Sequence, residues 1–148
     1  MKKQNRILIA LVLVLFLSAC SGGALQSNRE KWDSQAASHY RFNLSIGCFC
    51  PYHEIMPLTV EVQDGQIVSM TDVNGQPVRE EFRANFEEAA TIEGLFAIVE
   101  QAASGGADEI KVEYDAAYGF PSSISIDYIK EAMDDEISYH VLNFEVLP

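Results

Sequence analysis

Apolar positions recur along this chain with two different spacings, and one of them predicts strands. Every second residue is apolar in the segment that contains Tyr40, Phe42, Leu44 and Ile46. Such alternation is typical of a strand with one buried face, here ending at Gly47. Residues 58–63 repeat the pattern, and Asp64-Gly65 then predicts a hairpin turn into a third strand over residues 67–70. The register of that hairpin stays open, because pairing residue 62 with 67 puts Ser69, not an apolar residue, opposite Val60.

Three more strands are predicted in the C-terminal half. Residues 110–114 and 123–127 alternate in the same way, and a glycine-containing turn separates them. Residues 137–146 carry apolar side chains on both faces, which predicts a central or covered strand.

Apolar residues three and four apart predict two helices. Ser27 and Glu30 form a capping box for a short helix, whose apolar side would carry Trp32, Ala36, Ala37 and Tyr40. Thr91 is the expected N-cap of the second helix, with its stripe at Ile92, Leu95, Phe96 and Val99. Residues 73–90 read as a loop with one irregular helical turn around residues 82–86.

Together these elements predict an α+β fold: an antiparallel sheet of about six strands with two helices on one face. The order helix, then three strands, occurs twice, so two similar halves are expected. The opposite face of the sheet would be open and polar, with these residues: Asn43, Ser45, Thr59, Glu61, Lys111, Glu113, Ser123 and Ser125.

The N-terminus has the pattern of a secretory signal. Lys2, Lys3 and Arg6 precede an unbroken apolar run over residues 7–17, which predicts an N-terminal signal helix. The residues before Cys20 resemble a lipobox, the bacterial lipoprotein signal, in which the cysteine is acylated and becomes the first residue. We therefore expect a signal peptide over residues 1–19 that is cleaved before Cys20, a flexible tether over 20–27, and a single α+β domain over 28–148.

Charge limits the partners of the mature chain. Three of the ten basic residues are removed with the signal peptide. The mature chain would then contain seven basic and 22 acidic residues, a formal charge of −15. A surface this acidic repels nucleic acid and anionic lipid headgroups, so membrane attachment must come from acyl chains on Cys20. The expected location is the cell envelope, on the extracytoplasmic face of a membrane. Ser21 after the cysteine resembles an outer-membrane address if the source is Gram-negative, and the partner would be an unidentified envelope protein.

Cys48 and Cys50 remain once Cys20 is acylated. We favour a local disulfide that fixes the end of the first strand, because an oxidising compartment pairs thiols, although the C-x-C spacing is tight. The alternative is a metal or thiol-redox site at Cys48, Cys50 and His53, whose ligands suit Cu(I) or Zn(II). No cofactor is expected.

Other candidate residues are few. A surface site is considered at two turns, with these residues: Tyr118, Gly119, Asp134, Asp135 and Glu136. The acidic turn, with Asp127 upstream, lacks the glycine of a calcium loop, so a solvated loop is favoured. No G-x-S-x-G, H-E-x-x-H or phosphate-binding glycine motif occurs, so no catalytic residue is assigned and a non-enzymatic binding or structural module is expected.

Several short motifs spread over residues 32–144 resemble one bacterial family. They are Cys48-Phe49-Cys50-Pro51, residues 60–65, Leu95-Phe96, Tyr114-Asp115, residues 118–121, Ile126-Asp127-Tyr128 and residues 134–136. On these motifs the chain is similar to domain of unknown function 6174. The resemblance implies a small extracytoplasmic or lipid-anchored protein without an established activity, and it transfers no catalytic residues.

Overall fold

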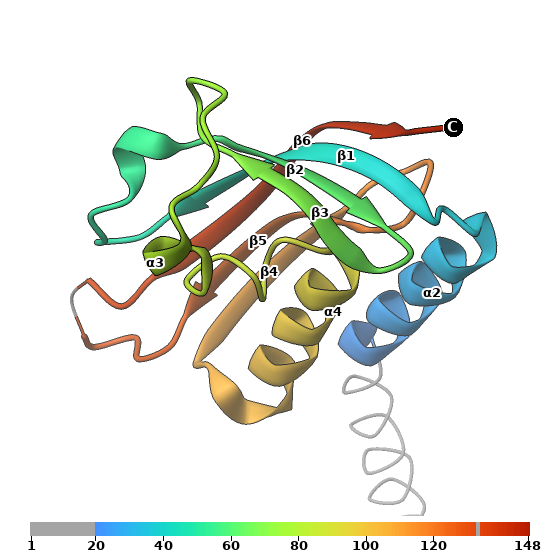
Figure 1. The fold of residues 1–148 in the computed structure, drawn as a ribbon. Helices are drawn as coiled ribbons and strands as arrows, with labels where there is room; N and C mark the ends of the chain where they lie inside the picture. The colour runs from blue at the N-terminus through green and yellow to red at the C-terminus, as the bar shows by residue number, and fades with distance from the viewer. Residues whose placement is uncertain (1–19, 133) are drawn as a thin grey trace, which may run out of the picture.

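The computed structural model describes residues 20–132 and 134–148, which form one six-stranded antiparallel sheet with helices on one face (Figure 1). The sheet order is β3-β2-β1-β6-β5-β4. The elements along the chain are α2 (Cys20–Gln35), β1 (His39–Gly47), the 3₁₀ turn η1 (His53–Ile55), β2 (Leu58–Gln63), β3 (Gln66–Thr71), α3 (Glu80–Arg83), α4 (Ile92–Gln101), the π turn η2 (Ala102–Gly106), β4 (Glu109–Tyr114), β5 (Pro121–Asp127) and β6 (Ile137–Val146). The expected α+β class is confirmed. The expected signal peptide over residues 1–19 lies outside the described residues.

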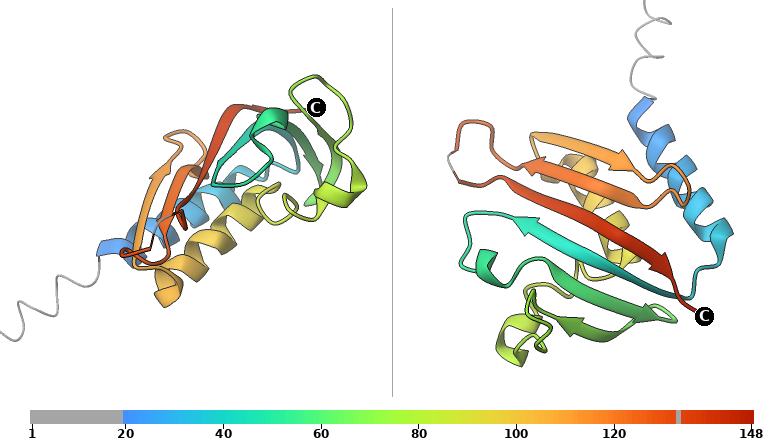
Figure 2. Two further views of the ribbon diagram at one scale, coloured as in Figure 1. Left: turned by 90° about the vertical axis from the view of Figure 1, so that its left-hand side faces the viewer. Right: turned by 90° about the horizontal axis from the view of Figure 1, so that it is seen from above.

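Two helix-plus-three-strand halves are present in the element order, but no rotation relates them. Across the sheet, both halves place their strands in the same order, with the third strand first and the first strand last. The first strands of the two halves, β1 and β4, nevertheless point in opposite directions. Superposing the halves would therefore turn the sheet over and place their helices on opposite faces. Both α2 and α4 lie on the same face (Figure 2), so the likeness of the halves ends at element order.

The first helix is longer than the sequence predicts. It begins at Cys20, so residues 20–27, where we expected a flexible tether, are helical, and Ser27 lies inside the helix instead of capping it. Side-chain hydrogen bonds join residues four apart in this first part of the helix; for example, Gln26 Nε2 donates to Glu30 Oε1 at 2.8 Å. The side chain of Leu25 also packs against the core, which gives this end of the helix an apolar contact. Among the described residues no helix is both long and apolar enough to cross a membrane.

Trp32 of α2 lies at the centre of an aromatic cluster under the sheet. Its ring meets those of Tyr40, Phe120 and Phe144 edge-on, with centroids 5.4, 6.0 and 5.9 Å away. The helix α4 contributes the predicted stripe of Ile92, Leu95, Phe96 and Val99, and Ile98, which was not predicted, is buried as well. One continuous core therefore fills the space between the helices and the sheet.

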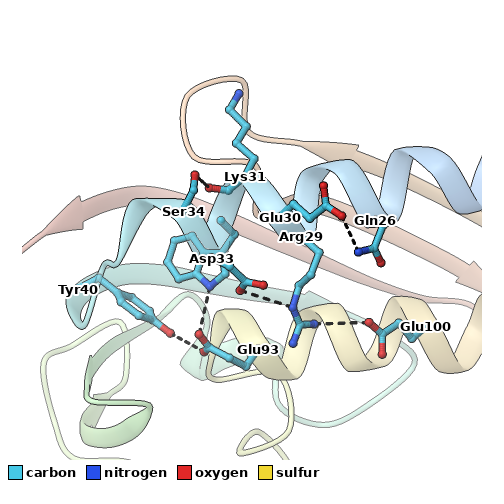
Figure 3. Close-up of polar contacts among 10 residues, drawn as sticks. Gln26, Arg29, Glu30, Lys31, Asp33, Ser34, Tyr40, Glu93 and Glu100 are labelled. Atoms are coloured by element: carbon cyan, nitrogen blue, oxygen red, sulfur yellow. Dashed lines mark hydrogen bonds and ion pairs between the residues drawn. The ribbon is translucent and has the colours of Figure 1, made fainter.

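Polar contacts attach α2 to α4 above this core (Figure 3). Trp32 Nε1 donates to Oε1 of Glu93 and the Tyr40 hydroxyl donates to Oε2 of the same carboxylate, both at 3.1 Å. The guanidinium of Arg29 lies 4.8 Å from the centre of the Phe96 ring and 3.5 Å from a carboxylate oxygen of Glu100. Burial raises the pKa of Tyr40, so its hydroxyl keeps its proton and remains a donor.

Two β-bulges keep apolar side chains turned toward the core. Val62 pairs with Ile67, as a two-residue turn requires, but a register shift then pairs Val60 with Met70. Val68 absorbs the shift and is 53% exposed, whereas Met70 is buried. This resolves the register that the sequence left open.

The second bulge lies in β6, which pairs with β1 and β5 and is central, as predicted. Its register against β1 shifts near Asn143, whose φ of 52° is left-handed. Val141 and Phe144 consequently both reach the core, although they are three residues apart.

The segment between β3 and α4 folds onto the helix start. It contains the short helix α3 and then a series of hydrogen-bonded turns, close to the irregular helical turn that was expected. Thr91 Oγ1 accepts from Gly94 N at 3.0 Å, which confirms the predicted N-cap. A Cβ on Gly94 would lie 1.8 Å from the carbonyl oxygen of Glu88, so only glycine lets this segment approach α4 so closely.

We expect Gly94→Ala to lower the free energy of unfolding by roughly 1–3 kcal/mol, the usual range for overpacking, because the obstacle is main-chain oxygen. Denaturant unfolding of the full chain measures this. Gly23→Ala is the matched control, since nothing lies within 4 Å of its Cβ and alanine favours a helix by about 1 kcal/mol. Equal stability of the two variants would contradict the close approach.

Candidate functional site

A partly open cavity of about 190 Å³ lies at the end of the sheet where β1 ends and β6 begins. We call it the disulfide cavity, because Cys48 and Cys50 form part of its wall. Apolar side chains make most of the remaining wall: Ile46, Met56, Phe86, Ala89, Ile98 and Ile137. They come from both halves of the chain and from the segment that packs on Gly94.

The loop from residue 48 to 57 is held over the cavity by aromatic and main-chain contacts. The Tyr52 ring stands edge-on to Phe86, with centroids 5.2 Å apart, and also contacts Phe82. Val73 N donates to the Ile55 carbonyl at 3.0 Å and thereby ties this loop to the segment after β3. The sequence pattern predicted a loop for residues 73–90, and this loop packs against residues 48–57. The two segments together form this part of the cavity wall.

Cys48 and Cys50 are placed as a disulfide pair, with Cα atoms 5.2 Å apart, directly after the last residue of β1. Both cysteines also line a second, more open hollow of about 480 Å³, together with Phe49, Pro51 and His53. Phe49 is 85% exposed at the tip. The structure therefore agrees with the favoured disulfide interpretation.

The structure brings together only some of the features required by the alternative, a metal or thiol-redox site at Cys48, Cys50 and His53. His53 shares the outer hollow with both cysteines but does not line the cavity. Across residues 20–132 and 134–148, no group of three His, Cys, Asp or Glu side chains is placed to hold a metal ion. The two sulfur atoms, paired with each other, are not available as thiolate ligands in this state.

Four polar side chains line the disulfide cavity: Asn85, Glu88, Tyr52 and Tyr139. Burial raises the pKa of Tyr139 to about 12, and smaller contributions from Tyr128 and from the Glu88 carboxylate act in the same direction. The Tyr139 phenol therefore stays neutral at physiological pH. Glu88, on the exposed side of the cavity, is the one charged residue in this wall.

No sequence pattern marks Glu88 or Tyr139 as a site residue. Glu88 belongs to a run of charged residues that reads as a solvated loop, and Tyr139 to a strand with apolar residues on both faces. Only the packing of distant segments brings them to the same wall.

The two predicted surface turns lie at opposite ends of β5 and do not form one site (Figure 1). Gly119 has a φ of 84° and lies against α2, where a Cβ would be 2.6 Å from the Asn28 carbonyl oxygen. Tyr118 packs on Phe120 and Phe144. This turn therefore supports the helix layer, while Asp134, Asp135 and Glu136 belong to the loop before β6.

The acidic loop is folded back on itself, which differs from the freely solvated loop expected there. Asp135 Oδ2 accepts from Ile129 N at 2.6 Å, and Asp108 Oδ2 accepts from Lys130 N at 3.0 Å. The Oδ1 atoms of Asp127 and Asp135 are buried without a hydrogen-bond partner. Burial raises the pKa of Asp127, and the charges of Asp135 and Glu136 raise it further.

Protein isolated without reductant should contain no free thiol at Cys48 or Cys50 and no bound copper or zinc. The reason is the local pairing of the two sulfurs. Thiol titration of the unfolded chain, together with metal analysis, measures both. Cys48→Ser/Cys50→Ser provides the zero-thiol reference, and two free thiols with near-stoichiometric metal would instead support the metal alternative.

Asp127→Asn should stabilise the fold at pH 7 and have little effect near pH 3. A carboxyl whose pKa is raised on folding binds its proton more readily in the native state, so native stability falls as pH rises through that raised value. Thermal unfolding of the two proteins across this pH range measures the difference. Glu113→Gln removes one exposed charge elsewhere on the sheet as a control, and equal pH profiles for both variants would contradict the expectation.

Comparison with known proteins adds a family to this description. No curated protein and no solved structure matches the chain. One family model, described as a family of unknown function (DUF6174), matches residues 24–146, which span most of α2, the whole sheet and the disulfide cavity. The chain therefore belongs to the DUF6174 family.

Proposed function

We propose that this chain is a lipid-anchored binding module of the bacterial cell envelope, and that the disulfide cavity is its binding site. The observation that carries the binding role is a partly open cavity with a mostly apolar wall that also holds a few polar side chains. Small-ligand sites have this composition, with the polar groups fixing orientation. The cavity lies where loops from both halves meet, and loops on a rigid sheet commonly carry binding residues.

The geometry favours binding over catalysis. In the described part of the chain, no serine or cysteine side chain is hydrogen-bonded to a histidine ring: His39 contacts Glu61 and the Pro148 carbonyl instead. The high pKa of Tyr139 disfavours the phenolate that a general base would need. The proposed module therefore acts by holding a ligand.

The anchor is Cys20, at the start of α2. Ala24 and Leu25, one turn further along, share a hollow with Ala103 and Ile110 beside the edge strand β4. The disulfide cavity lies at the end of the central strands β1 and β6. A membrane reached through Cys20 would leave the cavity and the open face of the sheet accessible. In a Gram-negative source, Ser21 would favour the outer membrane.

Thiol–disulfide exchange is the second candidate function. The observation in its favour is that Cys48, Cys50 and His53 line an open hollow at the surface. A thiolate of a partner protein would attack one sulfur and release the other as a thiolate. The thiol titration described above distinguishes a stable pair from a reduced one.

Cys20→Ser should abolish the incorporation of labelled fatty acid, leave the precursor uncleaved, and move the protein out of the membrane fraction. Acylation requires the thiol of Cys20, and durable anchoring needs two or more chains. Radiolabelling and membrane fractionation measure these outcomes. Ser21→Ala is the matched control, since it changes the next residue and leaves the thiol. Fatty acid incorporation into Cys20→Ser would contradict the proposed anchor.

A further inference from the structure

We infer that the disulfide cavity binds an alkylammonium group, with the apolar stem against the aromatic and aliphatic wall and the ammonium beside the Glu88 carboxylate. The inference rests on the proposed binding role of the cavity and adds the chemical class of its ligand. The group could belong to a lysine side chain of a partner protein or to a free amine.

The size of the cavity limits the ligand to a group as large as one amino acid side chain. The cavity offers a volume of about 190 Å³. Sites for drug-sized molecules and cofactors begin at roughly 300 Å³. A nucleotide or a full acyl chain is therefore too large, whereas a four- or five-carbon stem fits.

The wall of the cavity suits an apolar stem that ends in a positive charge. Ile98 and Ile137 offer aliphatic surface, and Tyr52, Phe86 and Tyr139 offer aromatic rings. Aromatic faces attract ammonium groups within about 6 Å of the ring centre. Because the Tyr139 phenol stays neutral, it contributes a ring and a hydroxyl to the wall without adding a second charge.

The charge of the cavity selects a cation over an anion. Glu88 is the single charged side chain in the wall, and no lysine or arginine lines it. An ammonium at Glu88 would keep part of its hydration, since Glu88 lies on the exposed side, and so would avoid the cost of a fully buried ion pair. The formal charge of the chain, −12, also attracts cations over a longer distance.

Glu88 is held in place by its own main chain. Its carbonyl oxygen packs against Gly94 at the start of α4, where a side chain would not fit. The neighbouring Ala89 is buried and lines the cavity. The carboxylate is therefore presented from a fixed backbone position, so that little ordering of the loop is required on binding.

Protein-observed NMR of the full chain in a neutral detergent tests this inference with three probes of equal length. The probes are n-butylammonium, n-butanol and butyrate, and the reporters are the amides of Ala89, Ile98 and Ile137. We expect saturable shifts with n-butylammonium, weaker binding of n-butanol and no binding of butyrate. Glu88→Gln should weaken n-butylammonium roughly fivefold, the scale of an ion pair at a partly exposed site, and leave n-butanol unchanged.

Glu54→Gln is the matched control, because it removes one exposed acid from the loop over the cavity without changing the cavity wall. Equal affinity of n-butylammonium for wild type and Glu88→Gln, or preferred binding of butyrate, would overturn the inference while leaving a binding module in place. Failure of all three probes to shift the reporters would overturn the cavity as a binding site, and with it the proposed function.

A lysine-containing tripeptide blocked at both ends distinguishes the two sources of the ammonium group. Phe49, 85% exposed between the two cysteines that line the cavity, offers an apolar side chain to a polypeptide that carries the lysine. If the natural source is a protein lysine, Phe49→Ala should weaken the tripeptide at least threefold and leave n-butylammonium unchanged. Equal loss for both probes, or for neither, would assign the site to a free amine.

Discussion

The indole of Trp32 is the contact on which the arrangement of both layers depends. Its ring packs on Tyr40 of β1, on Phe120 just before β5 and on Phe144 of β6, while its N–H donates to Glu93 of α4. One side chain of α2 thus contacts both halves of the sheet and the second helix. The polar atoms that this burial removes from water are satisfied, because Glu93 accepts from Trp32 and Tyr40 together. Because they share this core, the two helix-plus-three-strand halves form a single folded unit, although no symmetry relates them.

Strand alternation accounts for the sheet only because two bulges correct it. Without the shift at Val68, Ser69 would oppose Val60 and a polar hydroxyl would face the core. Without the left-handed residue Asn143, strict alternation after Val141 would bring Asn143 inward and Phe144 outward. Since Phe144 contacts Trp32, the second bulge is what allows the aromatic cluster to form. Local backbone irregularity thereby serves the packing of the core.

Most strands and the second helix could be predicted from the sequence, because their signals are local. Alternation identified β1 and β2, and the Thr91 cap with its apolar stripe identified α4. The start of α2 was missed, since the small residues before Leu25 resemble a linker when their contact with the core is unknown. The pairing of Cys48 and Cys50 was predicted from the expected oxidising compartment, although the C-x-C spacing is tight. Glu88 and Tyr139 were not predicted as site residues, because a residue's place in a cavity wall depends on segments about 50 residues away along the chain.

The position of the disulfide cavity follows from the sheet topology. β1 and β6 pair at the centre, so the first half ends a strand where the second half begins one. The first half contributes Ile46 and the cysteine loop, the second contributes Ile98, Ile137 and Tyr139, and the segment between them contributes Phe86 and Glu88. The cavity therefore exists only when the halves are packed together, and Gly94 sets how closely the joining segment approaches α4. A ligand held there would contact every part of the fold that the Trp32 cluster unites, so its binding should favour the assembled native state over the unfolded chain.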